Sequence, residues 1–93
     1  MNKPYVGDIG TILLLDCGVS IVDATVTNIL VEKPNGVFLT WVGSIYEEQY
    51  VKYTIKAGDW NLNGTWKYQS YVETPNWKGK GETVSQVVYT AFK

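Results

Sequence analysis

The chain has 93 residues, the size of one domain, and a net charge of −1 from eight lysines and nine acidic residues. It contains neither arginine nor histidine. The side chains most used for phosphate and base contacts, and the usual general base and metal ligand, are therefore missing, which argues against nucleic-acid binding and against catalysis.

Cys17 is the only cysteine, so no intrachain disulfide can form. We expect folding in a reducing cytoplasm or stabilisation by a partner, and we interpret Cys17 as a small apolar filler. The first residues do not resemble a signal peptide, and no apolar run approaches the roughly 20 residues that span a membrane. We therefore expect no membrane insertion.

Short segments rich in β-branched and aromatic residues, separated by Gly and Pro, predict about seven strands. In chain order they cover Gly10–Leu15, a short segment near Val19–Val22, Thr25–Lys33, Val37–Val42, Tyr50–Ile55, Thr65–Glu73 and Glu82–Tyr89. No stretch has the period of a helix. The spacing predicts one all-β domain over residues 1–93, an immunoglobulin-like antiparallel β-sandwich. We expect Met1–Tyr5 and Lys93 to be frayed unless a partner orders them.

The segment Lys33–Val37 contains Pro-Asn-Gly, the clearest turn signal in the chain. Asn-Gly favours a two-residue hairpin loop, whereas Pro-Asn-Gly as a whole favours a three-residue loop. The apolar pattern distinguishes between the two loop lengths, because a shift of the strand register by one residue moves every side chain to the other face of the sheet. A three-residue loop places Val31 opposite Leu39. It also places Ile29 opposite Trp41, so these four side chains form one apolar face, and we predict that register.

This register turns Leu30, Phe38 and Val42 away from the core. Two interpretations follow. Either a neighbouring segment covers these side chains or they are ordinary exposed apolar residues, or they form a contact patch for another subunit.

The segment Gly58–Trp66 is interpreted as a tight corner that leads into a strand. In immunoglobulin-like domains an aromatic residue after such a Leu-x-Gly corner locks the connection between the sheets. Trp66 takes that place here, where tyrosine is usual, and its indole N–H needs a partner if it is buried. Trp66, Tyr68 and Val72 are predicted to share one face of the strand.

The last hairpin loop is polar and rich in glycine, yet it carries Trp77, followed by Lys78 and Lys80. An aromatic residue on a polar loop is a candidate contact residue, and the other interpretation is that Trp77 folds back onto the sandwich edge. The strand Glu82–Tyr89 is apolar on both faces, which predicts that it lies between other elements or in an interface.

The remaining side chains offer little chemistry. The adjacent Glu47 and Glu48 would point to opposite faces of a strand, and the chain has no calcium-loop spacing, phosphate loop or dinucleotide fingerprint. We therefore predict no catalytic, cofactor-binding or metal-binding residue and no cofactor. The partner-contact candidates are Leu30, Phe38, Val42, Trp77, Lys78 and Lys80.

Several turn and corner motifs together resemble a known family. They are Tyr5-Val6-Gly7-Asp8-Ile9-Gly10-Thr11, Ala24-Thr25, Lys33-Pro34-Asn35-Gly36 with Trp41, Gly58-Asp59 with Leu62 and Gly64-Thr65, Tyr71-Val72-Glu73-Thr74, and Gly81-Glu82-Thr83 with Val88-Tyr89 and Phe92. Over nearly the whole chain they are similar to small tailed-phage and prophage proteins that resemble the immunoglobulin-like N-terminal domain of the baseplate upper protein. Turn and corner motifs of this kind indicate the fold more than the biological role.

The resemblance implies a non-catalytic structural subunit of a bacteriophage virion, made in the bacterial host cytoplasm. It would be a tail or baseplate adaptor or a particle decoration protein, with other virion proteins as partners in a symmetric assembly. The chain departs from the family pattern on the outer face of the Pro-Asn-Gly hairpin, which is polar in the family. It also ends at Lys93, where family members often continue into a longer fibre or receptor-binding region, so we expect a stand-alone adaptor, decoration or plug.

Two other functions remain open. The first is a carbohydrate-binding module that contacts host cell-surface glycan, with Trp60, Trp77 and Tyr71 as candidates for an aromatic platform. The second is a small inhibitor or regulatory protein.

Overall fold

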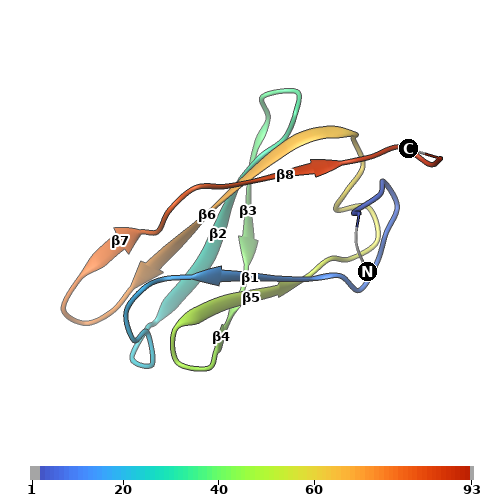
Figure 1. The fold of residues 1–93 in the computed structure, drawn as a ribbon. Helices are drawn as coiled ribbons and strands as arrows, with labels where there is room; N and C mark the ends of the chain where they lie inside the picture. Colours follow the sequence, from blue (N-terminus) through green and yellow to red (C-terminus); the bar gives the residue numbers. More distant parts are fainter. Residues whose placement is uncertain (1–2, 93) are drawn as a thin grey trace.

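The computed structural model describes residues 3–92 and contains eight strands within them, one more than the roughly seven expected (Figure 1). The strands are β1 (Ile12–Asp16), β2 (Val26–Glu32), β3 (Phe38–Val42), β4 (Ser44–Tyr46), β5 (Tyr50–Thr54), β6 (Gly64–Glu73), β7 (Lys78–Lys80) and β8 (Val84–Val88). The predicted all-β fold is confirmed. No helix in the described range is long and apolar enough to cross a membrane.

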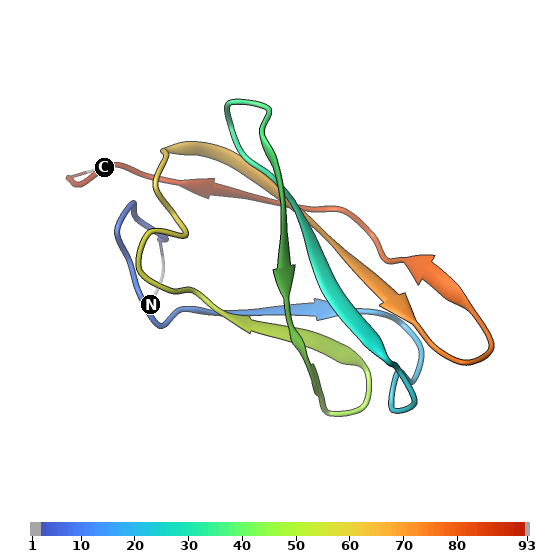
Figure 2. The same ribbon diagram turned by 180° about the vertical axis from the view of Figure 1, so that it is seen from behind.

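The strands form two antiparallel sheets that pack as a sandwich (Figures 1 and 2). One sheet has the order β1-β5-β4, and the other has the order β3-β2-β6, with β7 and β8 both paired to β6. The chain passes from one sheet to the other after β1, β3 and β5. This order corresponds to strands B-E-D and C′-C-F-G of an immunoglobulin-like domain.

The β2–β3 hairpin has the predicted register, with Ile29 opposite Trp41 and Val31 opposite Leu39. The Lys33 N–H donates to the Val37 carbonyl at 2.9 Å, which closes the loop over three residues. Gly36 within this loop has a φ of 85°, a left-handed conformation that glycine adopts without steric cost. The three-residue loop is therefore confirmed.

The predicted corner is also confirmed. Trp66 is fully buried, and its indole N–H donates to the Leu62 carbonyl at 3.0 Å, so the corner itself supplies the partner that the indole needs. Tyr68 and Val72 share the inward face of β6 with Trp66 and are buried too. Within the same sheet, the ring of Trp41 on β3 lies 6.2 Å from that of Trp66, measured between centroids.

The expected short strand at Val19–Val22 is absent, because this segment forms a loop across one end of the sandwich. The Ile21 N–H donates to the Glu48 carbonyl, and the fully buried Ile21 side chain closes that end of the core. The strands β4 and β7 were not expected. β4 continues β3 beyond Gly43, where a Cβ atom would lie 2.5 Å from a Val51 methyl carbon, so glycine allows the chain to change sheets.

The strand β8 lies at a sheet edge, so it does not lie in the middle of its sheet, and the expected interface at this strand stays a prediction. Its only described neighbour opposite β6 is the segment around Tyr5, which bridges in parallel to Tyr89. The Val6 N–H donates to the Tyr89 carbonyl, and the Tyr89 N–H donates to the Pro4 carbonyl. Pro4–Val6 is therefore paired, whereas Met1, Asn2 and Lys93 of the expected frayed ends lie outside the described residues.

Candidate functional site

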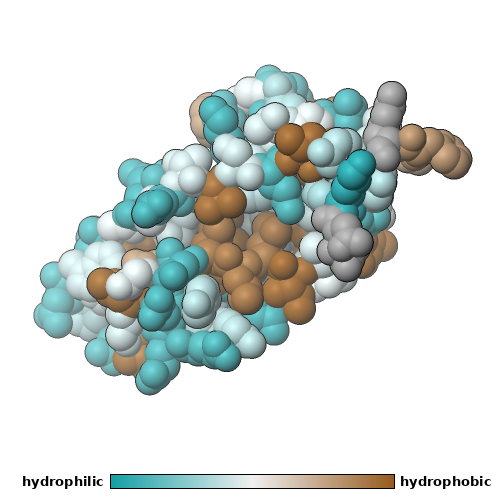
Figure 3. Space-filling view, in the orientation of Figure 1, coloured by the Kyte–Doolittle hydropathy of each residue, from teal (hydrophilic) through white to brown (hydrophobic). Residues whose placement is uncertain are grey.

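One side of the sandwich lacks a covering strand, and we call it the open side. It is bounded by β1, which pairs only with β5 among the described strands, and by β7 and β8, which pair only with β6. Figure 3, drawn in the orientation of Figure 1, shows apolar side chains gathered in the middle of the view where β1 and β8 lie. The exposed apolar residues of these two strands are Ile12, Leu14, Val84 and Val87.

Two hollows form a groove along the open side. The first, the Trp77 pocket, has a volume of about 430 Å³, and the second, the β1–β8 hollow, has about 310 Å³. The Trp77 pocket is lined by Cys17, Val19, Ser20, Ser70, Val72, Trp77, Gly79, Lys80 and Gly81. The β1–β8 hollow is lined by Leu15, Asp16, Cys17, Gly18, Gly81, Glu82 and Val84. The two share Cys17 and Gly81, and we call them together the open-side groove.

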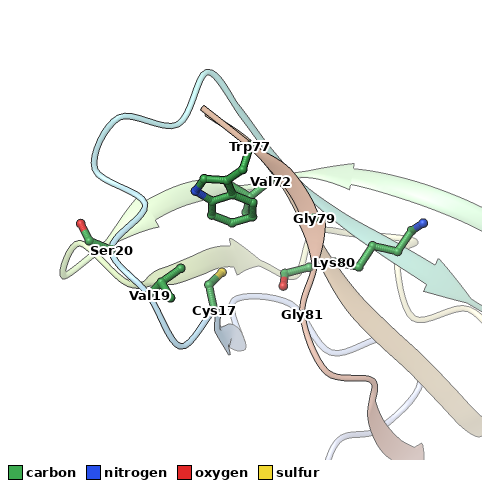
Figure 4. Close-up of a pocket in the computed structure, with 9 residues that line it drawn as sticks. Cys17, Val19, Ser20, Val72, Trp77, Gly79, Lys80 and Gly81 are labelled. Atoms are coloured by element: carbon green, nitrogen blue, oxygen red, sulfur yellow. The ribbon is translucent and has the colours of Figure 1, made fainter. Parts of the chain in front are cut away.

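The turn between β6 and β7 positions the Trp77 ring. The Thr74 N–H donates to the Trp77 carbonyl at 2.8 Å, and the Trp77 N–H donates to Oγ1 of Thr74 at 3.1 Å. The ring folds back over Gly79, where a Cβ atom would lie 3.0 Å from it. Figure 4 shows the indole, Val19 and Cys17 converging on the pocket. Trp77 is 39% exposed, so it both folds back and presents one side to solvent.

Gly81 joins the two hollows and sits against Ser70 of β6. The Gly81 N–H donates to the Ser70 carbonyl at 3.0 Å, and the Gln69 amide donates to the Gly81 carbonyl at 2.9 Å. A Cβ atom at Gly81 would collide with Oγ of Ser70. Glycine is therefore required for this close approach, which separates β7 from β8.

Cys17 lines both hollows and packs against the core. Burial raises the pKa of its thiol above the usual value. The thiol is therefore neutral at ordinary pH and a weak nucleophile, because the thiolate is the reactive form.

The side chains of Lys78 and Lys80 do not lie beside the Trp77 ring, although Lys80 lines the Trp77 pocket. Lys80 pairs with Tyr71 and Lys78 with Glu73, on the outer face of the sheet. Figure 4 shows the Lys80 side chain extending away from Trp77. Successive residues of a strand point to opposite faces, so these lysine side chains are separated from the Trp77 ring although they are close to it in sequence.

The other candidate surface is the outer face of the β2–β3 hairpin, which we call the hairpin face. Phe38 is 75% exposed and Val42 is 76% exposed, whereas Leu30 is partly buried. Leu30 and Phe38 line a hollow of about 350 Å³, together with Val31, Glu32, Lys67, Tyr68, Gln69 and Thr83. Val42 is on the same face but outside that hollow.

The three aromatic residues considered for a glycan platform do not share a surface. Trp60 is buried, and its indole N–H donates to the Tyr68 hydroxyl at 2.9 Å. Tyr71 lies on the outer face of β6, where its hydroxyl donates to Glu73 at 2.6 Å. Of the three, Trp77 lines one of the hollows described above.

The chemistry of both surfaces is apolar contact and hydrogen bonding. Within residues 3–92, no group of three or more His, Cys, Asp or Glu side chains could hold a metal ion. Every buried side-chain polar atom in this range has a hydrogen-bond partner.

No protein-family model matches the chain, and no curated protein or solved structure matches it at a significant level.

Sequence reasoning found Trp77 but missed Val19, Ser70 and Val72 as groove residues, because they come from different segments. The two glycines Gly79 and Gly81 could have indicated that another segment packs closely against this part of the chain, since a glycine in or beside a strand often marks close backbone approach.

Proposed function

We propose that this chain is a non-catalytic structural subunit of a bacteriophage virion, a tail or baseplate adaptor or a particle decoration protein, that acts through protein–protein contacts. One observation carries the contact role. Val84 and Val88 both face inward from β8, yet Val84 is 44% exposed and Val88 is 1% exposed. The core is thus uncovered at one place, as expected of a subunit whose neighbour completes it.

The hairpin face supports contact with more than one neighbour. Phe38 and Val42 are large apolar side chains that the register turns outward, on a different side of the molecule from the open-side groove. A subunit with two apolar surfaces suits a symmetric assembly of many copies. The assignment to a phage particle is supported by the resemblance of the turn and corner motifs.

The proposal is tested by mass spectrometry of phage particles purified from the host that carries the gene. The protein should be present at a fixed ratio to the other structural proteins. Variants Phe38→Ser and Trp77→Ala should fold, as judged by circular dichroism, and should be depleted from the particles. A soluble protein that is absent from purified particles contradicts the proposal and favours a regulatory role.

The alternative function, contact with host cell-surface glycan, now depends on Trp77. This ring borders a cavity of about 430 Å³, within the usual range for small-ligand sites. Titration with host-wall polysaccharide, followed by tryptophan fluorescence, tests it. Saturable binding that is lost in Trp77→Ala favours a glycan-binding module, and an unchanged signal at millimolar glycan excludes it.

A further inference from the structure

The hydrogen bonds at the two ends of β1 show which of its backbone groups are free. At one end the Ile55 N–H donates to the Thr11 carbonyl, and at the other end the Cys17 N–H donates to the Gln49 carbonyl. Hydrogen-bonded and non-bonded pairs alternate along an antiparallel ladder. The odd-numbered residues of β1 therefore bond to β5, and the even-numbered residues direct their N–H and C=O groups to the open side.

The even-numbered residues are Ile12, Leu14 and Asp16, and no described strand pairs with them on that side. Ile12 is 52% exposed and Leu14 is 45% exposed. Natural proteins protect edge strands with charges, proline or bulges, yet the four residues from Ile12 to Leu15 are all apolar. The β1 edge therefore offers both the hydrogen-bonding groups and the apolar surface that an added strand uses.

The β1–β8 hollow lies where an added strand would place side chains. A strand paired to β1 directs every second side chain inward, toward the hollow lined by Leu15 and Val84. Such side chains would cover Val84, the inward-facing residue that the sandwich leaves exposed. The space fits a strand with aliphatic residues at alternate positions.

The charges at the hollow distinguish between occupants. Asp16 and Glu82 line it, and no basic residue does. Hydrogen bonds from the Gln49 amide and the Gly18 N–H lower the pKa of Asp16, so it is a carboxylate at neutral pH. A second copy paired antiparallel about Leu14 would place its Ile12 opposite Asp16 and would bring no positive charge there. The two acidic residues therefore favour an occupant with a basic side chain, which a second copy in this register does not supply.

We propose that the β1 edge binds an extended segment of another virion protein, which adds as a strand to the β1-β5-β4 sheet. Its alternate aliphatic side chains enter the β1–β8 hollow, and a lysine or arginine lies near Asp16 and Glu82. Strand addition of this kind combines main-chain hydrogen bonds with pockets for alternate side chains. The inference rests on the proposed contact function and names the partner of the open-side groove.

Amide hydrogen exchange with two synthetic peptides tests this inference. Both alternate threonine and valine and have blocked termini. One has a lysine at each end, and the other has a glutamate at each end. At about ten times its Kd, the lysine peptide should slow exchange at Ile12, Leu14 and Asp16 about tenfold. The β5-bonded amides of Leu13 and Leu15 should change less, and the glutamate peptide should bind more weakly.

Two outcomes overturn the inference. One is unchanged exchange at the three outward amides with millimolar lysine peptide. The other is protection of the same amides without peptide as the protein concentration rises, which would identify a second copy as the occupant.

Proline at an outward position provides a sharp variant. Leu14→Pro removes an N–H that faces the open side and leaves the bonds to β5 intact, so it should fold and lose the peptide effect. The matched control is Thr40→Pro, which places proline at an outward position of the β3 edge and should keep the effect. If Leu14→Pro does not fold, Glu82→Lys provides the test. It leaves one negative and one positive charge at the hollow, so the preference for the lysine peptide should disappear, and an unchanged preference contradicts the charge assignment.

Particle incorporation separates this inference from the proposed function. If wild-type protein and folded Leu14→Pro enter particles equally, strand addition at β1 is wrong and the structural role stands. If wild-type protein is absent from particles, the virion role is wrong, whatever the peptide result.

Discussion

The hairpin face and the open-side groove both expose apolar side chains, but for opposite reasons. Phe38 and Val42 point outward because the hairpin register turns them away from the core. Val84 and Trp77 belong to the inward side of their sheet and are exposed because no described strand covers them. An outward side chain can remain in water in the finished fold, whereas an exposed inward side chain marks a place where the fold itself is incomplete.

The two regions also differ in what they offer a partner. The hairpin face is a sheet surface with a hollow of about 350 Å³. The open side combines a groove with the unpaired backbone of β1. A sheet face contacts a partner through side chains alone, whereas a strand edge beside a groove also selects for an extended segment with a definite register.

The largest expected difference comes from making the same substitution in both regions. Val72→Ala removes a buried side chain from the floor of the Trp77 pocket and should cost about 2 kcal/mol of unfolding free energy. Val42→Ala on the hairpin face should change it by less than about 0.5 kcal/mol. Urea unfolding followed by circular dichroism measures both values. Equal losses would break the distinction between the inward residues that line the open-side groove and the outward residues of the hairpin face.

A smaller effect is expected at the junction of the two hollows. Gly81→Ala places a methyl group against Oγ of Ser70 and should cost about 1–2 kcal/mol. In a Ser70→Ala background the added cost of Gly81→Ala should fall below about 1 kcal/mol, because the collision is removed. A double-mutant cycle from urea unfolding measures the coupling. If the two substitutions show no coupling free energy, the segment between β7 and β8 can move away from Ser70 without strain.

The effect that is smallest at neutral pH involves Tyr68 and should appear only in alkali. Burial raises the pKa of Tyr68 to about 12, from an unfolded value of about 10. Between these values the phenol is neutral in the folded protein and ionised in the unfolded one. Its contribution to stability is therefore complete below pH about 10 and is lost as the pH rises toward about 12. Urea midpoints across this range, with tyrosinate absorbance recorded in parallel, test the prediction. The same decline in Tyr68→Phe would assign it to other groups.

The elements defined by local chemistry were predictable from sequence. Pro-Asn-Gly sets the loop length of the β2–β3 hairpin, and the apolar pattern then sets its register. The corner before Trp66 combines a glycine with an aromatic residue whose polar group finds its partner four residues away. In both cases the deciding contacts lie within one short segment.

The open-side groove could not be predicted in the same way. Its walls come from the loop after β1, from β6, and from the turn that begins β7. β7 itself has the sequence Lys-Gly-Lys, which has low strand propensity. It forms because the Thr74–Trp77 turn returns the chain to β6. Val19–Val22 has the composition of a strand, yet it is a loop because Ile21 closes the end of the core.

The parallel bridge at Tyr5 and Tyr89 has a mechanical consequence. Two backbone hydrogen bonds join Tyr89 to Pro4 and Val6 at this bridge. The Lys3 ammonium lies 5.0 Å from the centre of the Tyr89 ring. Tension that pulls Lys3 and Phe92 apart would load these contacts together, in shear, before it reaches the central strands. Pro4–Val6 would therefore detach first under force, which would lengthen the chain while the sandwich stays folded.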